Sequence, residues 1–210
     1  MERFCDNQKF PELMVRTLCD DDGIRVVDAA YLFAQTTDNE DSVLIAGTRL
    51  YKDNRVGLLG ICAGDDRAAG YPGFSIWKEK LTRLGVPEHA IIGIDIPDGN
   101  LNTLTEATAL VRESKGRALK TLCVIASPFH QIRCFVSTVS IVLREYPELK
   151  VYSKVGCALE WNKRVAHSQM TTMGKRSELI AGELDRINRY HEKGDLVSPD
   201  EIINYLDQRD

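Results

Sequence analysis

The feature that most constrains the fold is an alternation of short apolar runs with longer segments of helical periodicity. The runs cover residues 42–47, 56–64, 90–96, 121–126 and 150–156. Strands that are apolar throughout are typical of a parallel sheet with helices on both faces. The sequence therefore predicts a Rossmann-like α/β protein with three layers, α/β/α, and a mostly parallel sheet of about five strands.

Apolar side chains recur every three or four residues between and around these runs, which indicates helices. We expect helices at 74–84, 102–116, 130–146 and 175–193, and a short last helix from Ser198. Residues 8–34 are interpreted as two further helices, broken at the "CDDDG" stretch. Only residues 48–55 separate the first two expected strands, and a parallel crossover needs about a dozen residues. Those strands are therefore antiparallel, or one assignment is wrong.

The length of 210 residues is typical of one domain. We expect a single domain, with N-terminal helices in residues 1–40, the α/β core in 41–156 and C-terminal helices in 157–210. A content of 43% hydrophobic residues is enough for a core, and the net charge of −4 argues against binding nucleic acid through its phosphates. No apolar run approaches the roughly 20 residues that span a bilayer, so no membrane partner is expected.

The six cysteines form no Cys-x-x-Cys pair and no zinc-site spacing with histidine. Such a pattern indicates reduced thiols and a cytoplasmic protein, because disulfides are rare in that compartment. No secretory signal is visible at the N-terminus. The sequence predicts no metal site and no certain cofactor.

Ligands of open α/β sheets bind beyond the carboxyl ends of the strands, so polar residues there are candidates. After the first two expected strands these are Gly47, Thr48, Arg49, Gly64, Asp65 and Asp66. Glycine lets the backbone approach a ligand, and the other side chains offer donors or carboxylates. The alternative, a plain tight turn at each place, carries about equal weight. Neither stretch has a dinucleotide or Walker pattern.

The stretch "LNTLTE" starts the helix after the third strand. Thr103 and Glu106 have the S/T-x-x-E spacing of a capping box, which would use both side chains structurally. Asn102 would then precede the cap and be free to contact a ligand. All three residues are ligand-binding candidates, with the capping box as the alternative for two of them.

The stretch "SPFHQIR" follows the fourth strand. Ser127 and Pro128 suit the N-cap and first position of a helix. His130 would lie in the first turn, where the helix dipole favours neutral imidazole, and Arg133 one turn later would face the same crevice. Ser127 and Phe129 are ligand-binding candidates, and His130 and Arg133 are the catalytic candidates. For a histidine at a helix start a structural role is the more common one.

Four motifs, "LGVPEHAI", "LNTLTEA", "IASPFHQIRC" and "ELIAGELDRINRYHEKG", occur in the order seen in one known family. The chain resembles the DUF218 family, also called YdcF-like or ElyC/SanA/YdcF, over residues 41–207. The resemblance implies a Rossmann-like fold with a polar cleft, lined here by Gly47, Gly64, Asn102, Thr103, His130 and Arg133. It also implies S-adenosylmethionine or nucleotide-like ligands. Two departures are the short segment 48–55 and Thr105 in place of the family's glutamate.

These observations leave three hypotheses. The first is an enzyme with transferase- or hydrolase-type acid–base chemistry on a small polar or anionic metabolite, nucleotide-like ones included. In it His130 acts as acid, base or oxyanion donor, Arg133 clamps an anionic group and Asn102 orients the substrate. The second is a non-catalytic sensor for S-adenosylmethionine or a nucleotide. The third is an interaction protein that uses residues 176–193, whose apolar stripe is more typical of core packing.

Overall fold

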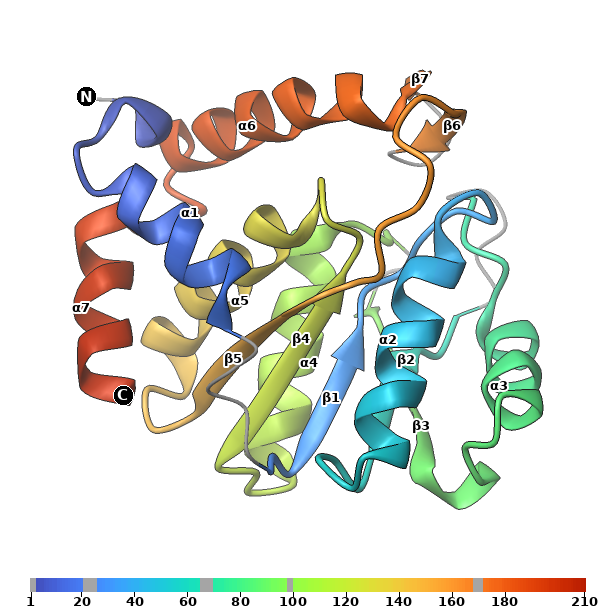
Figure 1. Cartoon of the computed structure of the whole chain (residues 1–210). Coiled ribbons are helices and arrows are strands. Elements are labelled where there is room, and N and C mark those ends of the chain that lie inside the picture. Colours follow the sequence, from blue (N-terminus) through green and yellow to red (C-terminus); the bar gives the residue numbers. More distant parts are fainter. Residues whose placement is uncertain (1–2, 21–25, 65–69, 98–99, 168–171) are drawn as a thin grey trace.

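The computed structural model describes residues 3–20, 26–64, 70–97, 100–167 and 172–210. Its centre is a five-stranded sheet in the order β3-β2-β1-β4-β5, and all neighbouring strands are parallel (Figure 1). The strands are β1 (Ala29–Leu32), β2 (Leu59–Cys62), β3 (Ile91–Ile94), β4 (Thr121–Ala126) and β5 (Lys150–Val155). The Rossmann-like three-layer fold is confirmed.

Helices cover both faces of the sheet. They are α1 (Phe10–Leu18), α2 (Glu40–Lys52), α3 (Phe74–Arg83), α4 (Thr103–Gly116), α5 (Gln131–Glu145), α6 (Arg176–Glu192) and α7 (Pro199–Arg209). Short 3₁₀ helices lie at Phe4–Asp6 and Glu88–Ala90. One core joins the sheet to α1, α4, α5 and α7, and a second joins it to α2 and α3. Among the described residues, none of these helices combines the length and apolarity that crossing a bilayer requires.

Strand β1 contributes to both cores, because successive side chains of a strand point to opposite faces. Tyr31 belongs to the core with α4 and α5, whereas Ala30 and Leu32 belong to the core with α2. All four residues of β1 are buried. A central parallel strand of this kind needs apolar or small residues at every position.

The first strand and the first crossover helix differ from the sequence prediction. The second expected N-terminal helix, within 24–34, is wrong, because residues 29–32 form β1. The expected strand at 42–47 is also wrong, because these residues lie in α2. Helix α2 supplies the connection between β1 and β2, so the short segment 48–55 is no obstacle to parallel pairing. The sheet also begins before residue 41, the expected boundary of the core, because β1 spans Ala29–Leu32.

The C-terminal segment covers one end of the sheet. The segment before α6 contains an antiparallel hairpin, β6 (Arg164–His167) and β7 (Thr172–Lys175), where the sequence predicts no strand. The hairpin and α6 lie across the carboxyl ends of the strands (Figure 1). The hairpin is held to the segment after β1, since Thr36 Oγ1 donates to the Ala166 carbonyl at 2.8 Å and Asp38 Oδ2 accepts from Ala166 N–H at 2.9 Å.

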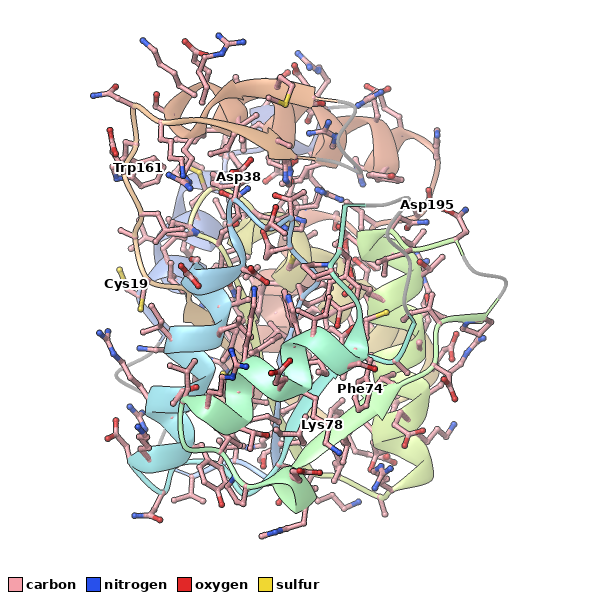
Figure 2. The ribbon with its side chains drawn as sticks, turned by 90° about the vertical axis from the view of Figure 1, so that its right-hand side faces the viewer. Cys19, Asp38, Phe74, Lys78, Trp161 and Asp195 are labelled. Carbon is pink, nitrogen blue, oxygen red and sulfur yellow. The ribbon has the colours of Figure 1, made fainter. Side chains whose placement is uncertain are left out.

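A second view shows this arrangement from the side of α3. Asp38 and Trp161 lie close to the layer of α6 and the hairpin, whereas Lys78 lies toward the other end of the molecule (Figure 2). Arg176, the first residue of α6, donates to the carbonyl of Asp38 at 2.5 Å and to Asn39 Oδ1 at 2.9 Å. These bonds fix the start of α6 above the carboxyl end of β1.

Candidate functional site

A polar cavity of about 240 Å³ lies beneath α6 at the carboxyl ends of the strands. Its polar lining side chains are Gln35, Thr36, Asn102, Thr103, Glu106, His130, Arg133, His167 and Arg186. Tyr71, Leu101, Ala34 and Tyr190 complete the wall. The cavity therefore combines residues from several elements that lie far apart in the chain.

The strand order explains why the cavity forms here. The chain runs outward from β1 through β2 to β3 and then returns to place β4 on the other side of β1. The loops after β1 and β4 therefore diverge, which opens a crevice at the carboxyl end of the sheet. Gln35 follows β1, His130 follows β4, and Thr103 starts the helix after β3. The general position expected for a ligand site is the position of the cavity.

The start of α4 differs from the expected capping box. Asn102 is the N-cap, and its Oδ1 accepts from the backbone N–H groups of Leu104 and Thr105. Thr105 Oγ1 accepts from Asn102 N–H at 3.0 Å. The expected box of Thr103 with Glu106 is wrong, and so is the expectation that Asn102 is left free. The capping box is formed one residue earlier, by Asn102 and Thr105, so the side chains of Thr103 and Glu106 are not used as caps and line the cavity.

Glu106 is a buried carboxyl group with one oxygen held and one oxygen free. Its Oε1 accepts from the Tyr31 hydroxyl and from the Ala34 N–H, both at 2.9 Å. Oε2 makes no hydrogen bond to the described residues, and it is not an enclosed unpaired atom either, so it faces the cavity that Glu106 lines. Burial raises the pKa of Glu106 to about 7, although these two hydrogen bonds and the charge of Arg133 lower it in part.

His130 is bonded through both ring nitrogens. Nδ1 lies 3.2 Å from Gln35 Nε2, and Nε2 lies 3.0 Å from Thr103 Oγ1. The Gln35 amide is oriented by its other bonds, since Nε2 donates to the Phe33 carbonyl and Oε1 accepts from Ser127 Oγ. Gln35 Nε2 must then donate to Nδ1, and the ring proton lies on Nε2, which donates to Thr103.

The charge state of His130 follows from its surroundings. Burial, followed by the charge of Arg133, lowers the pKa of His130 well below its ordinary value. The imidazole is therefore neutral at pH 7, as the sequence predicts. The main cause is burial, and α5 itself begins only at Gln131, with His130 as its N-cap residue.

Glu183 of α6 is a hub that holds three cavity side chains. Its oxygens accept from Arg133 Nε at 2.5 Å, from His167 Nε2 at 2.8 Å and from Arg186 Nη1 at 2.6 Å. Burial alone would raise the pKa of Glu183, but the charge of Arg133 and the hydrogen bond from His167 hold it well below its ordinary value. Glu183 is thus a carboxylate in the folded protein. Two guanidinium groups share this one carboxylate, which leaves an excess of positive charge.

The turn before α5 also differs from prediction. The expected N-cap at Ser127 is wrong, because residues 128–130 form a turn whose His130 and Gln131 N–H groups bond to the Ser127 carbonyl. The Ser127 hydroxyl instead donates to Gln35 Oε1 at 3.0 Å. Phe129 is buried against Val165 and Leu179, and its ring centroid lies 5.0 Å from that of His167. Phe129 therefore packs the hairpin onto the site rather than lining the cavity.

The candidates after the first two expected strands lie elsewhere. Gly47, Thr48 and Arg49 are in α2 and not at a strand end, so their expected placement is wrong. A methyl group at Gly47 would approach Leu32 Cδ1 to 2.9 Å, so this glycine allows α2 to pack on β1. Arg49 Nη1 contacts Cys157 Sγ at 3.3 Å. Gly64 is exposed beyond β2, and Asp65 and Asp66 lie outside the described residues.

The sequence did not single out Gln35, His167 and Arg186, which line the cavity, or Glu183, which binds two of the lining side chains through hydrogen bonds to His167 and Arg186. Gln35 was missed because residues 24–34 were expected to form a helix, so the end of a strand just before Gln35 was not recognised. His167 was missed because no strand was predicted there. Glu183 had a readable signal, because it stands four residues after Leu179 and four before Ile187, in the buried stripe of α6. A carboxylate in an apolar stripe indicates a buried partner.

The chemistry available at the cavity is hydrogen bonding, charge and proton transfer. Within the part of the chain that the structure describes, histidine, cysteine and carboxylate side chains form no group arranged to hold a metal ion. Comparison with protein-family models and with curated proteins finds no match to this sequence.

Proposed function

We propose that the chain is an enzyme that binds a small anionic metabolite in the cavity and uses Glu106 to transfer a proton. The observation that carries the proposal is the Glu106 carboxyl group, which is buried and has one oxygen facing the cavity. A pKa of about 7 suits such a group to accept and release a proton near neutral pH. Transferase- and hydrolase-type reactions both need a group of this kind.

The proposal that the ligand is an anion is supported by the charge around the cavity. Arg133 and Arg186 share the single carboxylate of Glu183. The N-terminus of α4 also points its positive dipole end at the cavity, since Thr103 is the first residue of that helix. Both features favour a negatively charged group on the ligand.

We assign His130 to positioning and not to proton transfer. Its two ring nitrogens are bonded to Gln35 and Thr103, and it stays neutral. It therefore fixes the Thr103 hydroxyl, which lies between it and Arg133. Glu106, which the sequence offered only as a ligand contact, takes the acid–base role in this proposal.

The size of the cavity favours a small ligand. A volume of about 240 Å³ is below the roughly 300–1,000 Å³ of pockets that enclose drug-sized molecules. It fits a small acid, or one moiety of a nucleotide whose remainder extends outside. A non-catalytic sensor for S-adenosylmethionine or a nucleotide is the second candidate. It is favoured by the bonded state of His130, whose two ring nitrogens are occupied by Gln35 and Thr103.

The resemblance to the DUF218 family is part of the same proposal. The four motifs quoted above support it, and so does α2, since a helical segment between the first two strands is typical of that family. We also propose a cytoplasmic location, which the six free cysteines support.

A ligand screen followed by one variant tests the proposed function. Inorganic phosphate, small carboxylates, nucleotides and S-adenosylmethionine are compared for the rise in melting temperature. A ligand at 100 times its Kd stabilises by about 2.7 kcal/mol, which is easily detected. Turnover of the ligand found, with a pH dependence near 7 that Glu106→Gln abolishes, supports the enzyme. Binding without turnover supports the sensor, and no stabilisation by any anion contradicts both.

A further inference from the structure

Arg133 presents donors to the cavity that no group of the described residues accepts. Its Nε donates to Glu183 and its Nη1 donates to Thr103 Oγ1 at 2.6 Å. Nη2 makes no hydrogen bond to the described residues, and it is not among the enclosed unpaired atoms. Because Arg133 is only 6% exposed and lines the cavity, Nη2 faces that cavity.

Thr103 presents a hydroxyl proton to the same cavity. Its oxygen accepts from Arg133 Nη1 and from His130 Nε2, which occupies both lone pairs. The hydroxyl must then donate outward, and the described residues offer it no acceptor. Arg133 and Thr103 therefore form a pair of donors suited to a carboxylate or phosphate oxygen.

An acceptor lies one helical turn from this pair of donors. Thr103 and Glu106 are three residues apart in α4, so their side chains lie on one face, with about 5–6 Å between their Cβ atoms. Glu106 Oε2 is the free oxygen of a side chain that is only 2% exposed. An unpaired buried carboxylate oxygen is costly, which favours a ligand that brings a donor to it.

We propose that the ligand is a small acid with a hydroxyl group close to its anionic group. The anionic oxygens bind Arg133 Nη2 and the Thr103 hydroxyl, and the ligand hydroxyl donates to Glu106 Oε2. This inference rests on the proposed function, because it assigns the ligand of the same cavity. It adds a requirement that anion binding alone does not include. The ligand must accept hydrogen bonds from Arg133 and Thr103 and must also donate one to Glu106.

The charge of Glu106 disfavours one related class. A diacid would place its second carboxylate against Glu106, where the two like charges repel. A hydroxyl group carries no charge and can donate to Glu106 at no such cost.

The test uses two pairs of probes that differ by hydroxyl groups. Lactate is compared with propionate, and glycerol 3-phosphate with propyl phosphate, by chemical-shift titration at pH 8 and matched ionic strength. At least one hydroxylated probe should bind about tenfold more tightly than its partner, because a hydrogen bond to a carboxylate is worth at least that. Malonate should bind more weakly than that probe.

Glu106→Gln links the preference to this side chain. The preference for the hydroxylated probe should fall to about threefold or less in the variant, whereas Glu192→Gln, an exposed change on α6, should keep it. Equal binding within both pairs overturns the inference and leaves the anion site of the proposed function intact. No binding by any anion overturns both. Because the wild-type comparison needs no substitution, a poorly folding variant does not obscure the result.

Discussion

Thr103 is the residue at which the polar network of the cavity converges. Its hydroxyl oxygen accepts from His130 of the turn after β4 and from Arg133 of α5. It thereby fixes the start of α4 relative to α5. Both donors are buried, so neither can turn to bulk water if the oxygen is removed.

Thr103→Val should destabilise the fold by about 1–3 kcal/mol, because it leaves buried donors without an acceptor while keeping the shape of the side chain. Thr103→Ser, which retains the hydroxyl, should lose much less. Urea unfolding of the two variants and the wild type measures the difference. Equal stability of the valine and serine variants would show that this hydroxyl is not a structural acceptor.

At the scale of single residues, Asn102, Thr103, Glu106, His130 and Arg133 line the cavity, but several of the expected local roles are wrong. Two overlapping S/T/N-x-x-S/T/E patterns occur in "NTLTE", and the sequence does not say which one caps the helix. The structure caps with Asn102 and Thr105. That one-residue shift turns Glu106 from a capping group into a cavity group, which accepts from Tyr31 and Ala34.

Helix α6 is the element that closes the cavity. It contributes Glu183, which binds Arg133 of α5 and His167 of the hairpin. The helix touches the rest of the fold mainly through the first 3₁₀ turn, α5 and the hairpin. One buried carboxylate therefore holds together three elements that cover the carboxyl ends of the strands.

Glu183→Gln should loosen this cover, because removing one partner of a buried ion pair leaves the others uncompensated at a cost of about 3–5 kcal/mol. Hydrogen exchange in residues 164–167 and 176–192 should accelerate about 100-fold or more, ahead of exchange in β1 and β4. Glu192→Gln on the same helix is the matched control. Unchanged protection of α6 would contradict the role of Glu183 as its anchor.

The misassignment of α2 as a strand has a physical cause. Helix α2 is buried on most sides, at Val43, Leu44, Ala46 and Leu50 among others. Its short apolar run cannot be told from a buried strand by periodicity. Long amphipathic helices with one wet face, such as α3, and the six-residue strand β4 were predicted within a few residues of their bounds.

At the scale of the whole molecule, the parallel sheet and its layers were predictable because strand burial on both faces leaves continuous apolar runs. The position of the hairpin and α6 over the carboxyl ends of the strands was not predictable, since the hairpin residues carry no strong strand pattern. His167 reaches the cavity, and Glu183 reaches His167, only through that long-range packing. The complete site thus depends on contacts between the C-terminal segment and the core.

The stability of the whole fold should depend on pH through Glu106. Its folded pKa of about 7 lies above the ordinary value of 4.5, so the folded protein binds more protons than the unfolded chain between these values. The contribution of Glu106 to the free energy of unfolding is greatest below pH 4.5 and decreases as the pH rises to about 7. The unfolding free energy of the wild type minus that of Glu106→Gln should therefore fall by about 3 kcal/mol across this window.

Denaturant unfolding of both proteins at a series of pH values measures this difference. Titration of Glu183 and of the surface groups is common to the two proteins and cancels. A difference that stays constant from pH 4.5 to 7 would mean that Glu106 titrates alike in the folded and unfolded states.

The most direct test of the central claim is the titration of the Glu106 carboxyl group itself. Carbon NMR of protein labelled at the glutamate side-chain carboxyl, with the Glu106 signal assigned from its loss in Glu106→Gln, gives the pKa in the folded state. The account predicts a midpoint near 7, as expected for a buried carboxyl group that faces the cavity. A midpoint near the usual glutamate value of 4.5 would contradict it, because Glu106 would then be an ordinary ionised carboxylate with no special capacity to transfer a proton at neutral pH.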